Sequence, residues 1–339
     1  RNANNMNKNM EKNSELLRVD SLKAWFPVKK GVFKRTHGYV RAVDGVSFSV
    51  RSGKSVGLVG ESGCGKTTVA RTLIRLIKPT EGRVCFDGMS VFDAGRADMR
   101  RFRRDVGMIF QDPYGSLNPR MTVGRIVGEP LRVQKRLRGQ ALSGRRQELL
   151  SKVGLGPSVI NRYPHEFSGG QRQRIGVARA LALDPKLVIC DEPVSALDVS
   201  IQSQILNLLK DLQDELGLTY LFIAHDLAVV EFFCDVVAVM YMGRIVEQAA
   251  ADELYRSPMH PYTQALLSAI PQVESEKQAA RIKLRGEVPS AMNVPSGCPF
   301  HPRCPLCEQR CTGEIQQLKE TEPGSGHFVA CWKTFKNGN

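Results

Sequence analysis

The stretch that decides the fold is Gly60-Glu-Ser-Gly-Cys-Gly-Lys-Thr67, which has the pattern G-x-x-x-x-G-K-[ST] of a phosphate-binding loop. Before it, Ser55–Val59 is a short apolar run typical of a strand, and after it, Thr67–Ile77 has helical spacing. Strand, loop and helix therefore follow one another in the order that this motif needs. The alternative is a glycine-rich turn that binds nothing, but such a turn would not need a strand before it and a helix after it. We predict a nucleotide site.

The residue types of this loop fit a nucleotide triphosphate bound with Mg²⁺. Its glycines have no Cβ, so backbone N–H groups can close around phosphate oxygens, and the following helix directs its positive end at them. Lys66 is expected to reach the β- and γ-phosphates, and the Thr67 hydroxyl to take one position on Mg²⁺. The predicted nucleotide-binding residues of the loop are Gly60, Glu61, Ser62, Gly63, Cys64, Gly65, Lys66, Thr67 and Thr68.

A pair of carboxylates follows a second strand-like run. Leu187–Cys190 is continuously apolar, as expected of a parallel strand buried on both faces, and Asp191 and Glu192 come directly after it. Ligands bind at this end of the strands in open α/β sheets. We expect Asp191 to hold Mg²⁺ and Glu192 to act as the general base on the attacking water. A carboxylate that only caps the next helix is the alternative, and it suits Asp198 better.

Further motifs occur in a fixed order around these two elements. Phe167-Ser-Gly-Gly-Gln-Arg-Gln-Arg174 resembles the signature motif of ABC-type ATPases, and Ser195-Ala-Leu-Asp198 resembles their D-loop. Gln111 is similar to their Q-loop glutamine and His225 to their switch histidine. The resemblance covers roughly residues 16–270. It implies that Gln111 and His225 join Glu192 in catalysis, and that Thr67, Gln111 and Asp191 hold the Mg²⁺ of a bound ATP.

The signature and D-loop residues are expected to act on a second copy of the site. In the family that the chain resembles, two cassettes face each other head to tail, and each ATP lies between the phosphate loop of one and the signature of the other. Ser168 and its glycines precede a helical stretch, Gln171–Leu183, so they offer free N–H groups to an anion but no acid or base. An ordinary helix start is the alternative. The residues concerned are Ser168, Gly169, Gly170 and Gln171 in the signature, and Ser195, Ala196, Leu197 and Asp198 in the D-loop.

Two assignments have strong structural alternatives. A histidine after a strand, as His225 follows Tyr220–Ala224, is often structural, and only its order after the D-loop favours contact with the γ-phosphate. Tyr39, at the start of the β-rich segment Val40–Val50, is our candidate for stacking on adenine. An aromatic residue there also suits packing, and His37 lies near enough to compete.

Strand and helix signals alternate over most of the chain, which predicts the α/β class with a mainly parallel sheet. We expect a P-loop ABC ATPase core with a β-rich flank over residues 16–258, and an inserted helical subdomain at about 112–178. Val199–Leu216 has an α-helical apolar period and ends before Gly217. Residues 1–15, rich in Asn and charge, are expected to be disordered, and residues 259–339 to form a small Cys-rich C-terminal extension.

Composition narrows the class of protein further. The 339 residues are 42% apolar and 24% charged, as is usual for globular proteins, and no apolar run approaches the ~20 residues that span a bilayer. The formal net charge of +14 allows either nucleic acid or an anionic membrane as a neighbour. Because the basic stretches Arg96–Arg104 and Arg132–Arg146 contain no recognisable nucleic-acid module, we expect no nucleic-acid partner. We predict a cytoplasmic protein lying peripherally on the inner face of the plasma membrane.

Two further segments resemble the ATP-binding subunits of oligopeptide and dipeptide ABC importers. They are Met108–Pro119, around the Q-loop, and His260–Ile270, at the start of the C-terminal extension of those subunits. The resemblance implies a substrate-translocating ATPase that pairs with a second ABC ATPase subunit, identical or related, and with two transmembrane permease subunits. A separate solute-binding protein would choose the peptide. The alternative is a soluble, non-transport ABC ATPase that acts on nucleic acid.

Five of the nine cysteines crowd the C-terminal extension. In a cytoplasmic ATPase this pattern favours a metal site or reactive thiols over disulfides, and Cys304-x-x-Cys307 beside His301 suits Zn²⁺. The importer family suggests another set, because its C-terminal motif holds a [4Fe–4S] cluster in some members. That resemblance selects Cys298, Cys304, Cys311 and Cys331 and leaves Cys307 outside the pattern. Four thiolates satisfy either a cubane cluster or zinc, and we favour iron–sulfur, in a structural role.

Overall fold

The structure is a computed structural model that describes residues 15–30, 35–270, 282, 284 and 286–335. These residues form two compact units, which are described separately. The first contains Val50–Ser55 and Phe86–Ile223, and the second contains Leu17–Ser49, Val56–Cys85 and the chain from Ala224 onward. The predicted disorder of residues 1–15 falls on residues outside the described part, except for Glu15, which is the first residue of strand β1.

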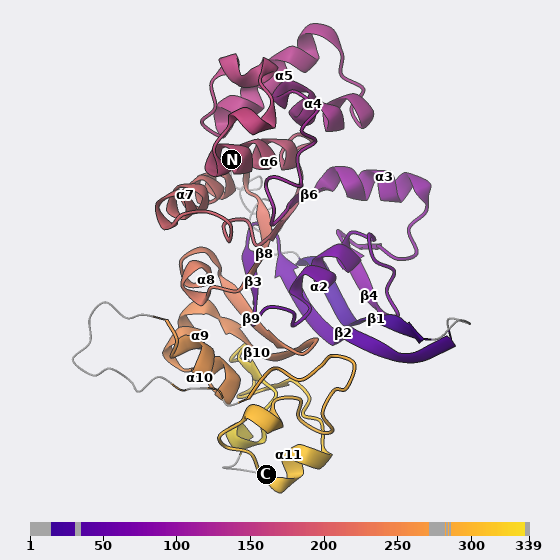
Figure 1. Ribbon diagram of the computed structural model, residues 1–339, viewed down its shortest axis with the longest axis vertical. Helices are drawn as coiled ribbons and strands as arrows, with labels where there is room; N and C mark the ends of the chain where they lie inside the picture. Colours follow the sequence, from indigo (N-terminus) through magenta and orange to yellow (C-terminus); the bar gives the residue numbers. More distant parts are fainter. Residues whose placement is uncertain (1–14, 31–34, 271–281, 283, 285, 336–339) are drawn as a thin grey trace, which may run out of the picture. The chain divides into compact units, whose positions relative to one another are not determined.

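The second unit begins with a β-rich segment. Strands β1 (Glu15–Lys30), β2 (Arg35–Arg51) and β4 (Glu81–Phe86) lie in the order β2-β1-β4 (Figure 1). Along β2, the buried residues Val46, Phe48 and Val50 alternate with exposed ones, because successive side chains of a strand point to opposite faces. The β-rich flank that was predicted beside the nucleotide-binding core is therefore present, and its first strand begins at Glu15.

A second sheet of this unit carries the phosphate loop. Its order is β11 (Lys319–Glu320), β12 (Phe328–Val329), β10 (Arg244–Ala250), β9 (Val236–Tyr241) and β3 (Ser55–Val59). β3 and β9 are parallel, and the other pairs are antiparallel. All five residues of β3 are buried, in agreement with its apolar sequence. Helices α2 (Lys66–Leu73), α8 (Leu227–Phe233), α9 (Ala251–Arg256) and α10 (Pro261–Leu267) complete the unit.

The C-terminal extension joins this sheet through a strand of its own. Val329 pairs with Glu247 and Phe328 with Gln248, both on β10. Val329 and Phe300 are almost fully buried, so the extension contributes apolar side chains to the core of the second unit. Short elements make up the rest of it, namely η3 (His301–Arg303), α11 (Gln309–Gly313) and η4 (Trp332–Phe335).

The first unit contains a parallel sheet with helices. Strands β6 (Val106–Ile109), β7 (Leu187–Asp191) and β8 (Thr219–Ala224) are paired in register and all run parallel. Helix α7 spans Val199–Leu216, as the apolar period predicted, and Gly217 ends it with φ 65°. The region predicted as a helical subdomain contains α4 (Val123–Val133), α5 (Gly139–Lys152), α6 (Gly169–Ala180) and the short η1 (Pro157–Asn161) and η2 (Pro164–Glu166) (Figure 1).

Two predicted helices have different ends in the structure. The helix expected over 67–77 stops at Leu73, because Arg75 has φ 59°, a left-handed conformation that closes the last turn. The helix expected over 171–183 begins at Gly169 and ends at Ala180, shortly before Asp184 with φ 57°. In both cases apolar residues continue beyond the helix, so periodicity alone predicted too long an element.

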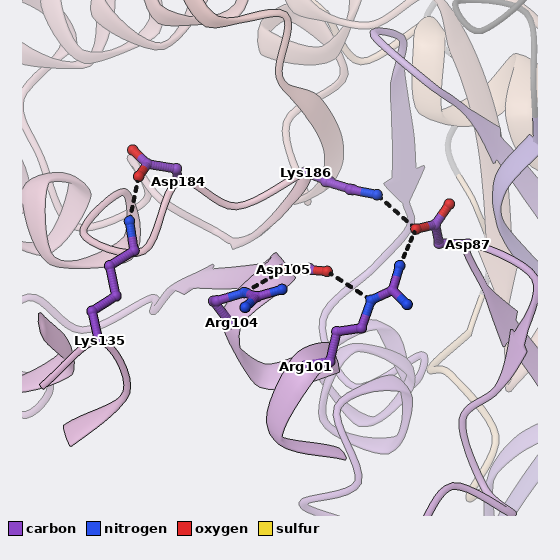
Figure 2. Close-up of polar contacts among 7 residues, drawn as sticks. All are labelled: Asp87, Arg101, Arg104, Asp105, Lys135, Asp184 and Lys186. Atoms are coloured by element: carbon purple, nitrogen blue, oxygen red, sulfur yellow. Dashed lines mark hydrogen bonds and ion pairs between the residues drawn. The ribbon is translucent and has the colours of Figure 1, made fainter. Parts of the chain in front are cut away.

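Helix α3 (Arg96–Asp105) is held in the first unit by packing and by a chain of ion pairs. Phe102 packs edge-on against Phe86, with ring centroids 5.2 Å apart. Figure 2 shows Asp87 bonded to both Lys186 and Arg101, and Asp105 bonded to Arg101 and Arg104. Because most of these groups are solvent-exposed, each ion pair contributes no more than about 1 kcal/mol. The aromatic pair contributes about 0.5–1.5 kcal/mol beyond the apolar area that it buries.

Candidate functional site

The phosphate loop of the second unit lies between β3 and α2, as predicted. Its three glycines have positive φ, with values of 153° at Gly60, 81° at Gly63 and 109° at Gly65. A Cβ on Gly60 would lie 2.1 Å from the Met240 carbonyl oxygen, and one on Gly65 would lie 2.0 Å from the Ala42 carbonyl oxygen. These two glycines are therefore required by the close approach of neighbouring backbone as well as by their own dihedral angles.

Lys66 is the buried cation of this loop. Its side chain donates hydrogen bonds to the carbonyl oxygens of Gly60, at 2.7 Å, and Glu61, at 3.1 Å, and the residue is 4% exposed. The ammonium group thus lies inside the ring that the loop forms. Together with the N-terminus of α2, it supplies positive charge where a phosphate would bind.

The C-terminal extension contacts the same loop through Glu61, which the sequence did not predict. The Glu61 backbone N–H donates to the Tyr262 hydroxyl oxygen at 2.9 Å. Arg303 donates to both carboxylate oxygens of Glu61, at 2.6 and 3.1 Å, and this bond raises the pKa of the guanidinium above its usual range. Tyr262 and Arg303 both fell within segments that resemble the importer family, but no local pattern shows that they reach a loop 201 and 242 residues away.

A buried polar network positions the segment that carries Tyr262. The carboxylate of Glu247, on β10, accepts the backbone N–H groups of Met259 and His260 and contacts the His327 ring at 2.8 Å. His260 precedes α10, and its Nδ1 accepts the backbone N–H of Tyr262 at 3.1 Å. The start of α10 is therefore fixed by side chains whose partners come from three parts of the sequence.

This network makes the second unit sensitive to acid. Burial lowers the pKa of His260 to about 4, whereas Glu247 acts in the opposite direction. Since the folded value lies below the unfolded value of about 6.5, stability is complete above pH 6.5 and is lost as the pH falls towards 4, by up to about 3 kcal/mol. Protonated Nδ1 can no longer accept the Tyr262 N–H.

We expect His260→Asn to flatten this pH dependence, because the Asn side-chain oxygen can cap the helix at any pH. Urea unfolding of the full chain between pH 4 and 8 measures the effect. His37→Asn is the matched control, since His37 is exposed on β2. If His260→Asn kept the pH slope of the unaltered chain, the assignment of acid sensitivity to His260 would be wrong.

Tyr39 and His225 also lie in the second unit. Tyr39 is 48% exposed on β2, and its ring centroid is 6.2 Å from that of Trp25. Trp25 in turn carries the Arg41 guanidinium over its ring at 5.0 Å. His225 is exposed directly after β8, just before Asp226, whose carboxylate caps α8. Adenine stacking by Tyr39 and phosphate sensing by His225 stay predictions.

In the first unit, the structure brings the predicted base and the Q-loop glutamine together. The Gln111 amide donates to the Glu192 carboxylate at 2.9 Å. Asp191 ends β7 and is 1% exposed. Glu192 has φ 48°, a left-handed conformation that costs a non-glycine residue of the order of 1–3 kcal/mol and that is concentrated at functional sites. Its N–H bonds to the Ile223 carbonyl oxygen at 2.9 Å, which helps to hold this conformation.

The signature residues form the N-terminus of α6. Ser168 is the N-cap: its hydroxyl accepts the Gln171 N–H at 3.4 Å, and the Gln171 side chain accepts the Ser168 N–H at 3.2 Å. A Cβ on Gly170 would lie 2.5 Å from a methyl group of Ile201, so only glycine lets α6 approach α7 there.

In the D-loop, the Ser195 hydroxyl donates to the Glu192 carbonyl oxygen at 3.1 Å. Asp198 is the N-cap of α7 but makes no side-chain cap hydrogen bond.

The C-terminal cysteines lie near one another in the second unit. Burial, together with negative charge on Cys311 or Cys331, raises the pKa of Cys298 to about 11. Burial likewise raises the pKa of Cys304 to about 11, with contributions from Cys331, Cys298 and Cys307. Cys307 is exposed and the other four are partly buried. Within the part of the chain that the structure describes, no three His, Cys, Asp or Glu residues are grouped closely enough to hold a metal ion.

These motifs define the class of an ATP-binding cassette: the phosphate loop in the second unit, and the Q-loop glutamine, the Asp191-Glu192 pair, the signature and the D-loop in the first. Similar solved structures agree with this class. One is described as the dimeric structure of a post-hydrolysis state of the ATP-binding cassette MJ0796 bound to ADP and Pi. It is 30% identical with a TM-score of 0.62, over 70% of this chain and 99% of that one. Residues 43–195 match the family described as ABC transporter.

A second match distinguishes the branch of this class. Residues 246–311 match the family described as the C-terminal region of oligopeptide/dipeptide transporters. The oligopeptide transport ATP-binding protein AppF of Bacillus subtilis is 51% identical over 93% of this chain and 96% of its own length. A probable peptide ABC transporter ATP-binding protein, y4tS of Sinorhizobium fredii, is 52% identical over 93% of this chain and 89% of its own. The chain belongs to the ATP-binding proteins of oligopeptide/dipeptide-type ABC transporters.

Proposed function

We propose that this chain binds Mg·ATP at Gly60–Thr67 and hydrolyses it with Glu192 as general base, and that the reaction drives peptide import through permease subunits. The curated relatives, whose names specify peptide or oligopeptide transport, support the substrate class. The single structural observation that carries the catalytic part is the Gln111–Glu192 hydrogen bond beside Asp191. It fixes a carboxylate at the carboxyl end of a parallel strand, where it can take a proton from water.

The chemistry also calls for a second cassette. Gly169 and Gly170 are the first residues of a 12-residue helix, whose initial N–H groups have no partner within the helix, and with the Ser168 hydroxyl they contribute no acid or base. They can bind a phosphate but cannot activate water by themselves. A signature that completes the site of another subunit fits these properties, and the similar cassette MJ0796 was solved as a dimer. Homodimer and heterodimer are both compatible with the sequence.

A groove in the first unit suits a permease segment. Its volume is about 440 Å³, and its lining includes Met108, Phe110 and Val133, with charged groups such as Arg103 and Glu129. β6 lies at the edge of the parallel sheet and leads through Phe110 directly to Gln111. A helix that docks here would touch the strand that positions the partner of Glu192. Such contact would couple movement of the permease to the position of Gln111 and so to ATP hydrolysis.

Co-purification tests the transport function. The full-length chain is expressed with two candidate permease subunits, and the complex is assayed for peptide uptake that depends on ATP and on a solute-binding protein. We expect the complex to form and Val133→Glu to weaken it, because Val133 is 68% exposed and lines the groove. Leu76→Glu, which changes a 65% exposed residue elsewhere, is the control. ATPase stimulation by DNA or RNA without a permease complex would instead favour action on nucleic acid, for which the matched families give no support.

We also propose that Cys298, Cys304, Cys311 and Cys331 hold a [4Fe–4S] cluster, with Zn²⁺ as the alternative. Four thiols whose charges influence one another supply the soft donors that both groups prefer. Because the described residues contain no preformed metal-binding group, the metal would have to draw these thiols together as it binds. Burial raises the pKa of Cys298, Cys304 and Cys331, so the thiolate form of these three side chains would need a bound cation to stabilise it. Bound metal would fix the extension on the second unit, which is a structural role.

Cysteine substitutions distinguish these metals. The chain is purified anaerobically, and iron, sulfide and zinc are quantified per chain. Cys298→Ser and Cys304→Ser are expected to lose the metal, whereas Cys307→Ser, the exposed cysteine outside the pattern, keeps it. Visible absorbance that bleaches with dithionite indicates iron–sulfur. A colourless protein with one zinc per chain indicates zinc, and a chain without metal from cells supplied with both would refute the proposal.

A further inference from the structure

The phosphate loop and the C-terminal extension meet at a partly buried ion pair between Arg303 and Glu61, and 29% of the Glu61 side chain is exposed. Arg303 lies in η3, between Cys298 and Cys304, and only 7% of its side chain is exposed. Its two N–H groups reach both carboxylate oxygens of Glu61, at 2.6 and 3.1 Å. A bidentate, charge-assisted pair of this kind is among the stronger and more directional polar contacts in proteins. Glu61 is the second residue of the loop, so the pair acts on the loop itself.

The residues around this pair are rigidly packed. Tyr241, Tyr262 and Phe300 are at most 1% exposed, and their ring centroids lie 4.7 to 5.4 Å apart. The Arg303 guanidinium lies over the Tyr241 ring at 6.0 Å. The Tyr262 hydroxyl, held in this cluster, accepts the Glu61 N–H at 2.9 Å. Glu61 is thereby fixed at both its backbone and its side chain by groups from outside the loop.

This arrangement has an electrostatic consequence for any anion that binds the loop. A carboxylate within the loop repels a triphosphate, and the repulsion grows where water is excluded. Arg303 compensates the charge of Glu61 and directs its carboxylate to the extension. Removing Arg303 would leave an unpaired negative charge beside the phosphates and would free the first turn of the loop. Both effects weaken binding of the nucleotide.

We infer that Arg303 and Tyr262 are positioning residues of the phosphate loop, so that nucleotide affinity depends on the C-terminal extension. The inference rests on the proposed nucleotide site at Gly60–Thr67. Neither residue is placed against the reacting atoms, and neither takes part in proton transfer. The extension thus helps to position the phosphate loop in addition to contributing to the core of the second unit. If residues 298–304 were displaced from the phosphate loop, ATP affinity would fall even in a chain whose catalytic residues are intact.

Binding and kinetic constants of the full-length chain test this inference. In Arg303→Ala, we expect the Kd for ATP and the KM to rise about 10-fold or more, as for the loss of a charge-assisted hydrogen-bonded pair, while kcat stays within about twofold. Arg303→Lys is expected to restore part of the affinity. Tyr262→Phe, which keeps the ring and removes only the hydroxyl, should raise Kd by about threefold.

Arg310→Ala is the matched control. Arg310 lies in the same extension and contacts the Trp332 ring at 4.7 Å and Glu308 at 3.3 Å, so its loss perturbs the extension but not the ion pair. We expect its Kd to match that of the unaltered chain. Equal effects of Arg303→Ala and Arg310→Ala on Kd would overturn the inference, because they would show a general structural role.

A double-mutant cycle isolates the pair. In a Glu61→Gln background, Arg303→Ala is expected to change Kd by less than about threefold, because the carboxylate that Arg303 compensates is gone. An undiminished effect would overturn the inference. A different result would show that Gly60–Thr67 is not the nucleotide site: the unaltered chain and Lys66→Ala would then bind ATP with equal affinity. Normal ATP binding by the unaltered chain together with an unchanged Kd in Arg303→Ala would refute the role of Arg303 alone.

Discussion

Glu192→Gln is expected to lower the rate of ATP hydrolysis by about 10²- to 10⁴-fold, the usual contribution of a general base, with little change in ATP affinity. The amide keeps the size and shape of the carboxylate, so the backbone conformation with φ 48° and the neighbouring D-loop are retained. It cannot accept a proton from water. Because the chain still binds ATP, it should accumulate as an ATP-bound dimer.

Steady-state hydrolysis and size-exclusion chromatography with Mg·ATP measure the two parts of this prediction. Glu215→Gln is the control, because it removes a carboxylate of the first unit that pairs with Lys152 at the surface. Its hydrolysis should equal that of the unaltered chain. Full hydrolysis by Glu192→Gln in the assembled transport complex would show that another group activates the water.

Lys66→Ala is expected to reduce ATP affinity by about 100-fold or more. Lys66 is the buried cation of the loop and already donates two hydrogen bonds within it. Charge-assisted hydrogen bonds are worth about 1.5–3 kcal/mol each, and ATP would receive them in place of the Gly60 and Glu61 carbonyl oxygens. Their loss also leaves the phosphate charge without its nearest compensation.

Equilibrium binding of a fluorescent ATP analogue checks this result. Lys186→Ala is the matched control, since Lys186 forms a surface ion pair with Asp87 (Figure 2) and its side chain is 48% exposed. Its affinity should be unchanged. If Lys66→Ala bound ATP as tightly as Lys186→Ala, the loop at Gly60–Thr67 would not be the nucleotide site.

Local sequence patterns predicted the elements that carry the site. β3 and β7 were recognisable because both are continuous apolar runs, as strands buried on both faces must be. α7 was predicted near its observed bounds, because its apolar period ends at a glycine that can adopt φ 65°. The helix after the phosphate loop was predicted too long, since Arg75 takes a left-handed conformation that no local signal marks.

Contacts between distant residues could not be predicted in this way. The bond from Gln111 to Glu192 joins residues 81 positions apart, and the pair from Arg303 to Glu61 spans 242 positions. The network of Glu247, His260 and His327 is formed by residues whose types are unremarkable in the sequence. In each case the partner depends on how strands and loops pack, and residue type alone does not specify it. Part of the chain, including residues 1–14, lies outside the described structure.

The sequence by itself determined that this chain has the motifs of an ATP-hydrolysing cassette, because the spacing of glycines, lysine and carboxylates around short strands is a local property. It also marked the C-terminal cysteines as a group. Only the tertiary structure decided that the C-terminal extension reaches the phosphate loop, because the Arg303–Glu61 pair forms only when η3 packs beside that loop within the second unit, in which β12 pairs with β10. The physical reason is that a buried charge needs a partner, and folding selects that partner from residues far away in the sequence.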